Sequence, residues 1–595
     1  MNAAQRHRGP DDEGVARCAD EVVLGNTRLA IIDTSAAGHQ PMNDPLTGNW
    51  ITYNGETYNF RQLRNEMGEE GWSSNTDTEV VLRAYGKWGT GAFQKLRGMF
   101  ALGIWDEAKQ ALVLARDPIG IKPLYYYVAD DRLLFASELR ALLASGLAPR
   151  TLSVAGVDSY LAWGSVESPL TIVDGVRQLL PGHYLEAKVS AAGGVELIDV
   201  EFARRNTEQV VSDRAEAVVR LRAELEESLQ HHLISDVPIG VFLSGGIDSS
   251  ALVALMSRLT KQRPKTFSVV FDEDSFTEAP FSRAVARRFE TDHNEIRLSE
   301  RELIEILPEA IGAIDQPTMD GINTFVVSRA VKQAGVTVAL SGLGGDELFA
   351  GYPSFRRAIR LDAMSTVSKR VLWAAAGVGK VALNGSVQRH KLWDLANSHG
   401  DPPDVYRVSR QLFSSDSVTR MTGREARRAE LHNGNNHDAV NTISRLELKG
   451  YMTNTLLRDT DAMSMAHSLE VRVPFVDTQV VDYVLSLPGE WKMGRGSGPK
   501  ALLADAVADL LPRDFMARPK MGFTLPFERW MQQDLRSEIS SVFQDPCLSV
   551  AGLNAGAVRK IWYDFLDKPR AVGWSRPWSL YVLAKWCERN GVTSV

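Results

Sequence analysis

Residues 239–256 read Ile-Gly-Val-Phe-Leu-Ser-Gly-Gly-Ile-Asp-Ser-Ser-Ala-Leu-Val-Ala-Leu-Met, and this stretch decides the fold of the larger part of the chain. The apolar run 239–243 has the length of a buried strand, and 251–256 is typical of the first turns of a buried helix. A strand, a loop of small residues and a helix start form an anion site, because glycine lets the backbone approach and the free N–H groups of the helix point at the anion. Asp248 can hold a metal bound to that anion, and no Gly-Lys-Ser/Thr follows as in a Walker loop.

A second glycine-rich loop follows another short apolar run. Residues 336–340 read Val-Thr-Val-Ala-Leu, and 341–347 read Ser-Gly-Leu-Gly-Gly-Asp-Glu. A third run, 266–271, supplies a neighbouring strand and a wall for an adenine base. Ligands of open α/β sheets bind at the carboxyl ends of the strands. The two loops therefore predict one phosphate site approached from two strands, and the structural alternative is a pair of Gly-Ser turns closing βα units.

Composition excludes several classes of protein. The chain has 595 residues, of which 44% are hydrophobic and 24% charged, as in ordinary globular proteins of two or three domains. The net charge of −7 argues against a sequence-independent nucleic-acid binder. Three scattered cysteines suit neither a disulfide framework nor a zinc site and favour a cytoplasmic location. The most apolar stretch, 371–383, is broken by glycine and lysine, so no membrane partner is expected.

The organisation of the chain changes near residue 200. Residues 1–185 hold short β-branched and aromatic runs separated by turns, which predicts an antiparallel β-rich layered domain of α+β type, with a last hairpin turn at 191–195. From 212 to about 350, helical and strand patterns alternate, which predicts an α/β domain with a parallel sheet. Residues 365–437 and the C-terminal part read as helical.

Ordered motifs over most of the chain resemble the glutamine-dependent asparagine synthetases, and the first glycine loop resembles the pyrophosphate loop of ATP pyrophosphatases. The resemblance implies an N-terminal-nucleophile (Ntn-type) glutaminase domain over 1–200 and an ATP-pyrophosphatase synthetase domain over 211–595. The motifs that carry it are 7–14, 28–33, 38–42, 53–59, 77–79, 98–101, 115–117, 120–125, 135–138, 244–250, 341–347, 461–466, 469–475 and 518–523.

The resemblance implies roles for residues of the first domain. Arg28 is expected to pair with the α-carboxylate of glutamine and Asp77 with its α-ammonium group. Asn54 and the Gly55 N–H are expected to form the oxyanion hole, and Glu56 belongs to the same glutamine-binding set. Taken singly, these residues read as a surface arginine, a hairpin turn and a helix cap.

The resemblance also implies an ATP and Mg²⁺ site in the second domain. Lys500 is expected to balance negative charge on the phosphoryl transition state, and Asp248 and Asp346 to hold Mg²⁺. The residues expected to contact ATP are Leu243, Ser244, Gly245, Gly246, Asp248, Ser249, Val269, Ser341 and Gly342.

The first departure from the family concerns the glutaminase nucleophile. The family's nucleophile is a cysteine at the mature N-terminus, on a short apolar strand upstream of the His-Arg-Gly-Pro motif, which here starts at His7. We expect Met1 to be an internal methionine of a longer reading frame, and a natural ammonia-dependent form is the alternative. The chain as printed is expected to use ammonia and not to hydrolyse glutamine. Cys18 lies downstream of the motif and cannot use its own α-amine as base.

The second departure is Leu343. Many members of the family carry an acid at this position, which helps to form the β-aspartyl-AMP intermediate. Asp346 and Glu347 are the nearby acids expected to replace it. Residues 315–317 and 320–324 border the expected acceptor pocket.

The sequence thus predicts a ligase that converts aspartate to asparagine through β-aspartyl-AMP, with release of AMP and pyrophosphate. One alternative keeps this chemistry on another carboxylate, such as a secondary metabolite or a cell-surface sugar. A β-lactam-forming synthetase is disfavoured because the glutamine-binding set is retained, and a non-catalytic nucleotide-binding regulatory protein because both the 244–250 loop and Lys500 are retained. The expected partners are small molecules, and whether the chain forms a homodimer stays open.

Overall fold

The structure is a computed structural model that describes residues 1–68, 71–129, 131–190, 193–203, 211–271, 279–362, 395, 401–425, 438–494, 499–511, 525–544 and 547–594. Within these residues, no helix combines the length and apolarity needed to cross a bilayer. The motif at 518–523, the apolar stretch 371–383 and most of the helical prediction over 365–437 lie outside the described residues.

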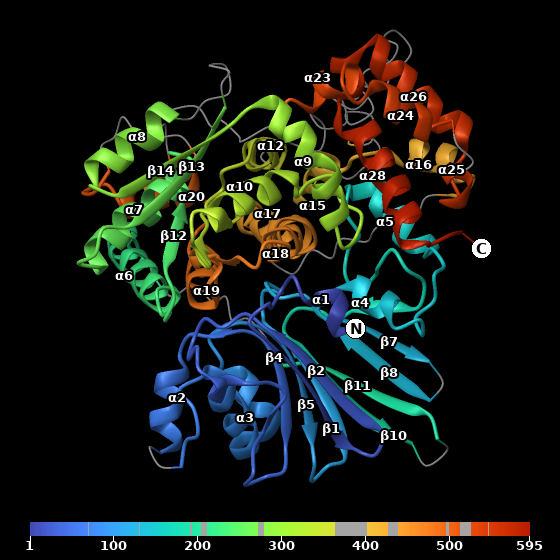
Figure 1. The fold of residues 1–595 in the computed structure, drawn as a ribbon. Coiled ribbons are helices and arrows are strands. Elements are labelled where there is room, and N and C mark those ends of the chain that lie inside the picture. Colours follow the sequence, from blue (N-terminus) through green and yellow to red (C-terminus); the bar gives the residue numbers. More distant parts are fainter. Residues whose placement is uncertain are drawn as a thin grey trace.

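Residues 1–203 form a layered α+β arrangement (Figure 1). Its centre is a six-stranded antiparallel sheet with the order β11-β10-β6-β5-β4-β3. Successive side chains of β5 point to opposite faces, so that Phe100 and Ile104 pack toward helices α2 and α3 while Ala101 packs toward β7. The elements are α1 (Asn2–Gln5), β1 (Asp12–Ala19), β2 (Val22–Arg28), β3 (Met42–Asn43), β4 (Trp50–Thr57), α2 (Phe60–Met67), α3 (Asp77–Trp88), β5 (Gly98–Asp106), β6 (Ala111–Arg116), β7 (Tyr125–Ala129), β8 (Arg132–Ala136), α4 (Leu139–Ala144), α5 (Val154–Trp163), β9 (Val176–Gln178), β10 (His183–Val189) and β11 (Val195–Glu201).

Two small sheets, β1-β2 and β8-β7-β9, belong to the same layered part. β2 and β8 are edge strands of these sheets, and among the described residues no strand pairing joins them to each other. The antiparallel pairing of β10 with β11 sets Val189 opposite Val195, as a hairpin there requires, while residues 191 and 192 of the predicted turn lie outside the described residues.

Residues 239–340 form the predicted parallel sheet, which β16 extends, in the order β14-β13-β12-β15-β16. The three predicted strands are confirmed, and they lie side by side as β13, β12 and β15. Helices α6 and α7 pack on one face, where Val241 and Leu252 are buried together, and α10 packs on the other. The elements are α6 (Arg214–His232), β12 (Ile239–Phe242), α7 (Ile247–Leu259), β13 (Lys265–Phe271), α8 (Ala279–Arg288), β14 (Asp292–Leu298), α9 (Glu300–Ala313), α10 (Ile322–Gln333), β15 (Val338–Leu340) and β16 (Glu470–Arg472).

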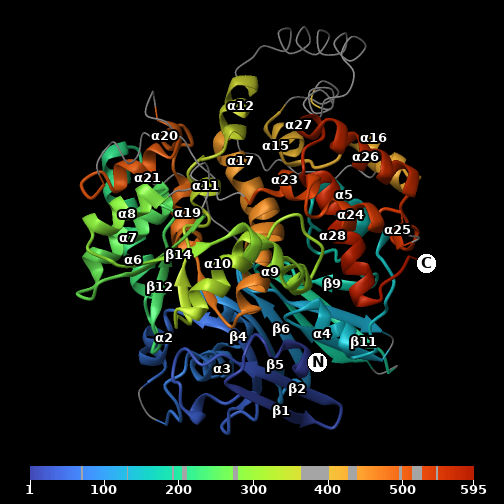
Figure 2. The ribbon, with the colours of Figure 1, turned by 45° about the horizontal axis from the view of Figure 1, so that its top comes forward.

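The remaining described residues are mainly helical. Most of the helices between 345 and 465 lie beside the parallel sheet, whereas α16 and the helices after 525 lie at the far side, where they pack with α5 and α9 (Figures 1 and 2). The Tyr160 hydroxyl on α5 donates to the Ser579 carbonyl on α28 at 2.7 Å, which joins the first part of the chain to its last helix. The helices are α11 (Gly345–Leu348), α12 (Pro353–Asp362), α15 (Pro402–Arg410), α16 (Ser415–Thr422), α17 (Ala439–Glu447), a π-helix (Leu448–Leu457), α18 (Arg458–Met465), α19 (Thr478–Ser486), α20 (Glu490–Met493), α21 (Ala501–Ala506), α23 (Phe527–Gln532), α24 (Arg536–Val542), α25 (Cys547–Val550), α26 (Ala555–Asp567), α27 (Pro569–Val572) and α28 (Ser575–Asn590).

Candidate active sites

The first glycine loop connects β12 to α7 in a conformation that needs glycine. Gly245 has φ of +73°, in the left-handed region, and a Cβ atom there would lie 2.6 Å from the backbone nitrogen of Ser282. Gly246 is the N-cap of α7, and the Ser244 hydroxyl accepts from its N–H at 3.2 Å. The loop is therefore a compact turn that leaves the start of α7 facing the carboxyl end of the sheet.

The second glycine loop meets the first because β12 and β15 are neighbours in the sheet. Asp248 lies in the first turn of α7 and Asp346 in the first turn of α11. The contact between the loops is so close that a Cβ atom on Gly342 would lie 2.9 Å from Cβ of Asp248, and one on Gly345 would lie 2.4 Å from its Oδ1. Glycine at both positions is thus a packing requirement.

Lys500 joins the two loops. Its Nζ lies 2.6 Å from Asp346 Oδ1 and also forms an ion pair with Asp248. The residue is 5% exposed and is the N-cap of α21, with a left-handed φ of +61°. Burial opposes its charge, but the carboxylates of Asp248 and Asp346 outweigh burial and raise the pKa of Lys500. The arrangement holds one fixed positive charge and two carboxylates beside two helix starts.

The two carboxylates also suit a phosphate-bound magnesium ion. Among the described residues there is no group of three or more His, Cys, Asp or Glu side chains that could hold a metal ion by itself. Mg²⁺ bound with a nucleotide needs only one or two carboxylates, because phosphates and water complete its octahedron. Asp248 and Asp346, brought together against glycines 342 and 345, fit that requirement.

The other residues expected to contact ATP surround this point. The Leu243 N–H donates to the Phe267 carbonyl at 2.8 Å, which fixes the end of β12 against β13, the strand that carries half-buried Val269. Ser249 and Ser244 hydroxyls lie 3.1 Å apart within the first loop. At the start of the second loop, the Ser341 N–H donates to a carbonyl of β16 at 2.9 Å. The structure thus brings the whole predicted set to one edge of the sheet.

The two acids expected to replace the missing acid at Leu343 do not lie together. Asp346 contacts Lys500, but Glu347 is buried on the other side of α11, where the Tyr352 hydroxyl donates to its Oε1 at 2.5 Å. Burial and the neighbouring Asp346 raise the pKa of Glu347. Leu343 itself is partly buried and packs against the apolar core. Consecutive residues of a helix point in different directions, so the two acids have different partners, and the replacement of the missing acid by either of them stays a prediction.

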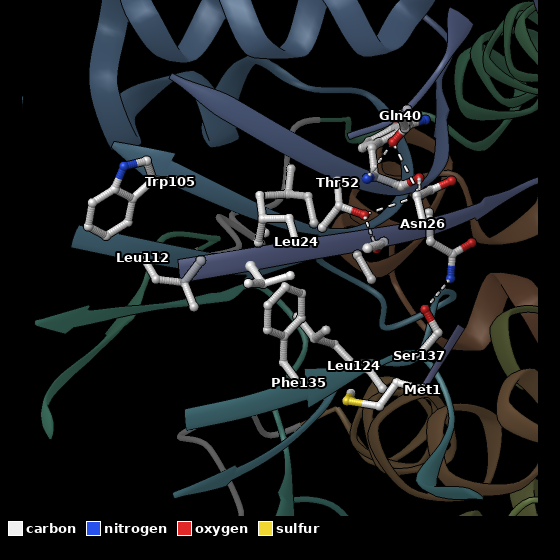
Figure 3. A pocket seen from close by; sticks show the side chains of 18 of the residues that line it. Met1, Leu24, Asn26, Gln40, Thr52, Trp105, Leu112, Leu124, Phe135 and Ser137 are labelled. Carbon is white, nitrogen blue, oxygen red and sulfur yellow. Dashed lines mark hydrogen bonds between the residues drawn. The ribbon is translucent and has the colours of Figure 1, made fainter. Parts of the chain in front are cut away.

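A cavity of about 1000 Å³ lies in the layered part of the chain (Figure 3). The expected glutamine-binding residues all line it: Arg28, Asn54, Gly55, Glu56 and Asp77. The guanidinium of Arg28 is buried and donates to the carbonyls of Ser35 at 2.9 Å and Ile32 at 3.3 Å, so it is no surface arginine. The five residues that the resemblance groups together therefore share one cavity, and their binding of glutamine stays a prediction.

Polar groups of the cavity are held in fixed positions. The Asn54 side chain donates to the Ser137 hydroxyl at 3.1 Å. A Cβ atom on Gly55 would lie 2.1 Å from the Met99 carbonyl oxygen of the paired strand, which explains the glycine. Asp77 accepts from the Thr57 N–H at 2.8 Å, and burial raises its pKa to about 6. Burial, together with the carboxylate of Glu470, also raises the pKa of Glu56.

The other end of the cavity is apolar. It runs between the edge strands β2 and β8, and Leu24 and Phe135 face each other across it (Figure 3). Trp105 and Leu112 of the six-stranded sheet line it further along. This apolar end thus lies beside two strands that are each at the edge of a small sheet.

Cys18 lies outside this cavity. It is half-buried on β1, and its Sγ makes only a weak 3.8 Å contact with the Ala16 carbonyl. Burial raises the pKa of its thiol to about 11, so it is protonated at neutral pH. That Cys18 has no catalytic role stays a prediction of the sequence.

A buried network of alternating charges joins the two parts of the chain, and sequence reasoning missed it. Arg8 Nη1 lies 3.0 Å from Glu138 and 2.8 Å from Asp461 of α18. Lys122 bridges Asp461, at 3.4 Å, and Glu470. These residues occur within the quoted motifs, but nothing in their spacing indicated that they meet.

The network ends at the cavity of the layered part. Arg472 is fully buried, binds Glu470 at 2.8 Å and lies 3.5 Å from Glu56, which lines the cavity. The backbone carbonyl of Arg472 accepts from the Ser341 N–H of the second glycine loop at 2.9 Å. One residue thus contacts both candidate sites, through its side chain on one side and its backbone on the other.

Comparison with known proteins places this geometry in a family. The family model for asparagine synthase matches residues 220–588, and the one for a glutamine amidotransferase domain matches residues 1–196. The chain is 31% identical over 557 residues to glutamine-hydrolyzing asparagine synthetase 1 of Bacillus subtilis, covering 92% of this chain and 86% of that protein. It is 31% identical over 564 residues to a putative asparagine synthetase of Mycobacterium tuberculosis, covering 89% and 83%. It is 29% identical over 593 residues to amidase chry2 of Gibberella zeae, covering 90% and 86%. With two glycine loops joined by a buried lysine and a match over most of its length, the chain belongs to the asparagine synthase family of carbon–nitrogen ligases.

Proposed function

We propose that this chain uses ATP to adenylate the side-chain carboxylate of aspartate and forms asparagine when ammonia attacks the β-aspartyl-AMP, with release of AMP and pyrophosphate. The observation that carries the proposal is the contact of Lys500 with Asp248 and Asp346, one from each glycine loop. Adenylation needs phosphates held in line and negative charge neutralised as pyrophosphate leaves, and these groups supply the required charges.

The residues of the synthetase site have distinct parts in this reaction. N–H groups of the 244–250 loop and the start of α7 hold the phosphates. Asp248 and Asp346 hold Mg²⁺, which neutralises phosphate charge and orients the leaving group. Lys500 leaves its carboxylate partners for the phosphoryl oxygens when ATP and Mg²⁺ bind. The two acids thus keep the lysine charged and in place before the substrate arrives.

The cavity of the first part of the chain binds glutamine in this proposal. Arg28 and Asp77 hold the α-carboxylate and the α-ammonium, and Asn54 with the Gly55 N–H faces the amide oxygen. The cavity also reaches Lys122 and Glu470 of the charge network, which lies between it and the second glycine loop. Support comes from the convergence of these groups on one cavity.

A second candidate function keeps the chemistry and changes the acceptor. Leu343 stands where many members of the family have an acid, and it packs on the apolar core. The relatives also include proteins named as amidases, such as amidase chry2. Both observations favour a carboxylate acceptor other than aspartate as the alternative.

Acceptor-dependent exchange between ATP and labelled pyrophosphate tests both candidates. With ammonium chloride absent, aspartate is expected to stimulate exchange, and with it present, asparagine and AMP are expected in equal amounts. If another small acid supports exchange and aspartate does no better than buffer, the aspartate assignment fails and the ligase class stands. If no acid in the panel supports exchange, the adenylation mechanism itself fails.

A further inference from the structure

Arg410, the last residue of α15, is enclosed by aromatic rings and bound to a buried carboxylate. Its guanidinium lies between two tyrosine rings, 4.3 Å from the ring centre of Tyr352 and 3.8 Å from that of Tyr451. One edge, made of Nε and Nη2, binds the carboxylate of Glu447 at 2.8 Å. Glu447 is completely buried, so this edge is fixed.

The other edge of Arg410 has Nη1, for which no hydrogen bond or ion pair occurs within the described part of the chain. The side chain is 19% exposed, so the guanidinium is accessible from one direction. A guanidinium with covered faces and one fixed edge offers its remaining donors to a carboxylate at little cost in side-chain entropy. The geometry is that of a carboxylate-binding arginine.

An acidic residue, Asp320, contacts the hydroxyl of Tyr451, whose ring covers Arg410. The Tyr451 hydroxyl donates to Asp320 Oδ2 at 3.3 Å, and the Gly321 N–H donates to Asp320 Oδ1 at 2.9 Å. Asp320 is half-buried in the loop before α10. Tyr451 therefore holds a cation against its ring and an anion at its hydroxyl. A cation and an anion that lie one tyrosine apart complement the carboxylate and ammonium groups of an α-amino acid.

This pair of charges is connected to the ATP-binding site through Tyr352. Tyr352 covers Arg410 and donates to Glu347, the neighbour of Asp346. It directly follows Gly351, where a Cβ atom would lie 2.5 Å from Cε of Lys500 and 1.9 Å from Asp346 Oδ1. The helices that carry these residues, α11, α12, α15 and α17, lie together beside the parallel sheet (Figure 2).

We propose that Arg410 binds the α-carboxylate and Asp320 the α-ammonium of the acceptor, so that the acceptor class is an α-amino acid whose second carboxyl group reaches Lys500 and Asp346. The inference rests on the proposed function and narrows it to zwitterionic acceptors. It disfavours sugars and simple organic acids, which lack this pair of charges.

The experiment uses the full chain and three acceptors in the pyrophosphate-exchange assay. Aspartate carries both α groups, β-alanine lacks the α-carboxylate, and succinate lacks the ammonium. For the wild type, aspartate is expected to give a KM at least tenfold below that of either analogue. Arg410→Gln is expected to raise the KM for aspartate about 10- to 100-fold, the range for a lost charge-assisted hydrogen bond, and to leave that for β-alanine within threefold. Asp320→Asn is expected to raise the KM for aspartate and to leave that for succinate within threefold.

Arg407→Gln is the matched control, because Arg407 lies on the same helix and pairs with Asp404 at 2.8 Å. If Arg410 has only a structural role, Arg410→Gln should change the KM values of all three acceptors alike or lower the melting temperature. In that case Arg410→Lys, which keeps the charge but loses the planar pair of N–H donors, decides through its KM for aspartate. The inference is overturned if Arg410→Gln changes the KM values for aspartate and β-alanine equally, or if the wild type has the same KM for succinate as for aspartate. If the wild type shows exchange with no acid at all, the proposed function fails. The inference is then tested separately by calorimetric titration of aspartate, whose binding should be lost in Arg410→Gln.

Discussion

The two candidate sites hold their charged groups in opposite ways. In the synthetase site, Lys500 is bound to Asp248 and Asp346, so each charge already has a partner. In the cavity of the layered part, Arg28 and Asp77 face about 1000 Å³ of space and are held by backbone groups. The first site is closed by its own ion pairs, and the second is preformed.

The difference indicates how each site meets its substrate. ATP and Mg²⁺ bring charges of both signs. The phosphates can therefore replace the carboxylates as partners of Lys500, and Mg²⁺ can replace Lys500 as the partner of the carboxylates. Glutamine is a small zwitterion, and a preformed cavity with fixed donors binds it with little reorganisation. The synthetase site should therefore be sensitive to any change in charge or spacing, and the cavity should respond mainly to the ionisation of its acids.

The largest effect is expected from removing the charges of the synthetase site. Lys500→Ala should lower acceptor-dependent exchange by about 10²–10³-fold, the usual loss for one electrostatic donor at a transition state. Asp248→Ala should abolish exchange, because it removes a metal ligand as well as the partner of Lys500. Asp505→Ala, on the same helix as Lys500 but exposed, is the control. Near-wild-type exchange in Asp248→Ala would exclude the mechanism.

The second-largest effect is expected from changing the spacing between the two glycine loops. Gly345→Ala puts a Cβ atom 2.4 Å from Asp248 Oδ1, so that the carboxylate must move. A misplacement of about 1 Å at a reacting centre can cost about 10²-fold in rate. Exchange should fall by that order while the melting temperature changes little. Gly91→Ala meets nothing within 4 Å and should leave exchange unchanged. Equal activity of the two variants would show that the loops are not held in fixed contact.

A smaller, pH-dependent effect is expected in the cavity. The pKa of Asp77 is about 6, so this carboxyl is neutral below that pH and charged above it. Because the α-ammonium of glutamine pairs with the charged form, affinity should rise about tenfold from pH 5 to pH 7. Calorimetric titration of glutamine into the full chain measures this. Asp77→Asn should bind weakly at both pH values, and an unchanged slope in that variant would assign the titration to another group.

No effect is expected from Cys18→Ala. The thiol lies outside the cavity and its pKa is about 11, so neither exchange nor ammonia-dependent amide formation should change by more than twofold. Glutamate release from glutamine by the chain of residues 1–595 is the sensitive readout. Release that is robust in the wild type and disappears in Cys18→Ala would mean that this thiol is the nucleophile after all.

Sequence reasoning was most successful where function depends on local structure. The 244–250 loop, the strand before it and the helix after it are consecutive in the chain, and glycines with positive φ report directly on backbone conformation. Arg28 and Asp77 were placed by resemblance, and both line the cavity. The sequence did not show that Glu347 is bound by Tyr352, because adjacency to Asp346 does not fix the direction of a side chain on a helix.

Residues that act over long sequence separations were not predictable. Arg8 and Asp461 are separated by more than 400 positions and meet in a buried ion pair. An arginine at the end of a helix is common, so the sequence does not single out Arg410. Only the packing of α15 beside Tyr352 and Tyr451 makes it a candidate for acceptor binding. No pattern of period 2 or 3.6 carries information about such contacts.

The sequence by itself determined the classes of fold, the two glycine loops and the family, because these follow from short motifs whose geometry is set by neighbouring residues. The tertiary structure alone decided that Lys500 lies between Asp248 and Asp346, that Arg472 contacts both sites, and that Arg410 shares Tyr451 with Asp320. The physical reason is that buried charges are stable only with partners, and the partners are brought together by the packing of whole sheets and helices.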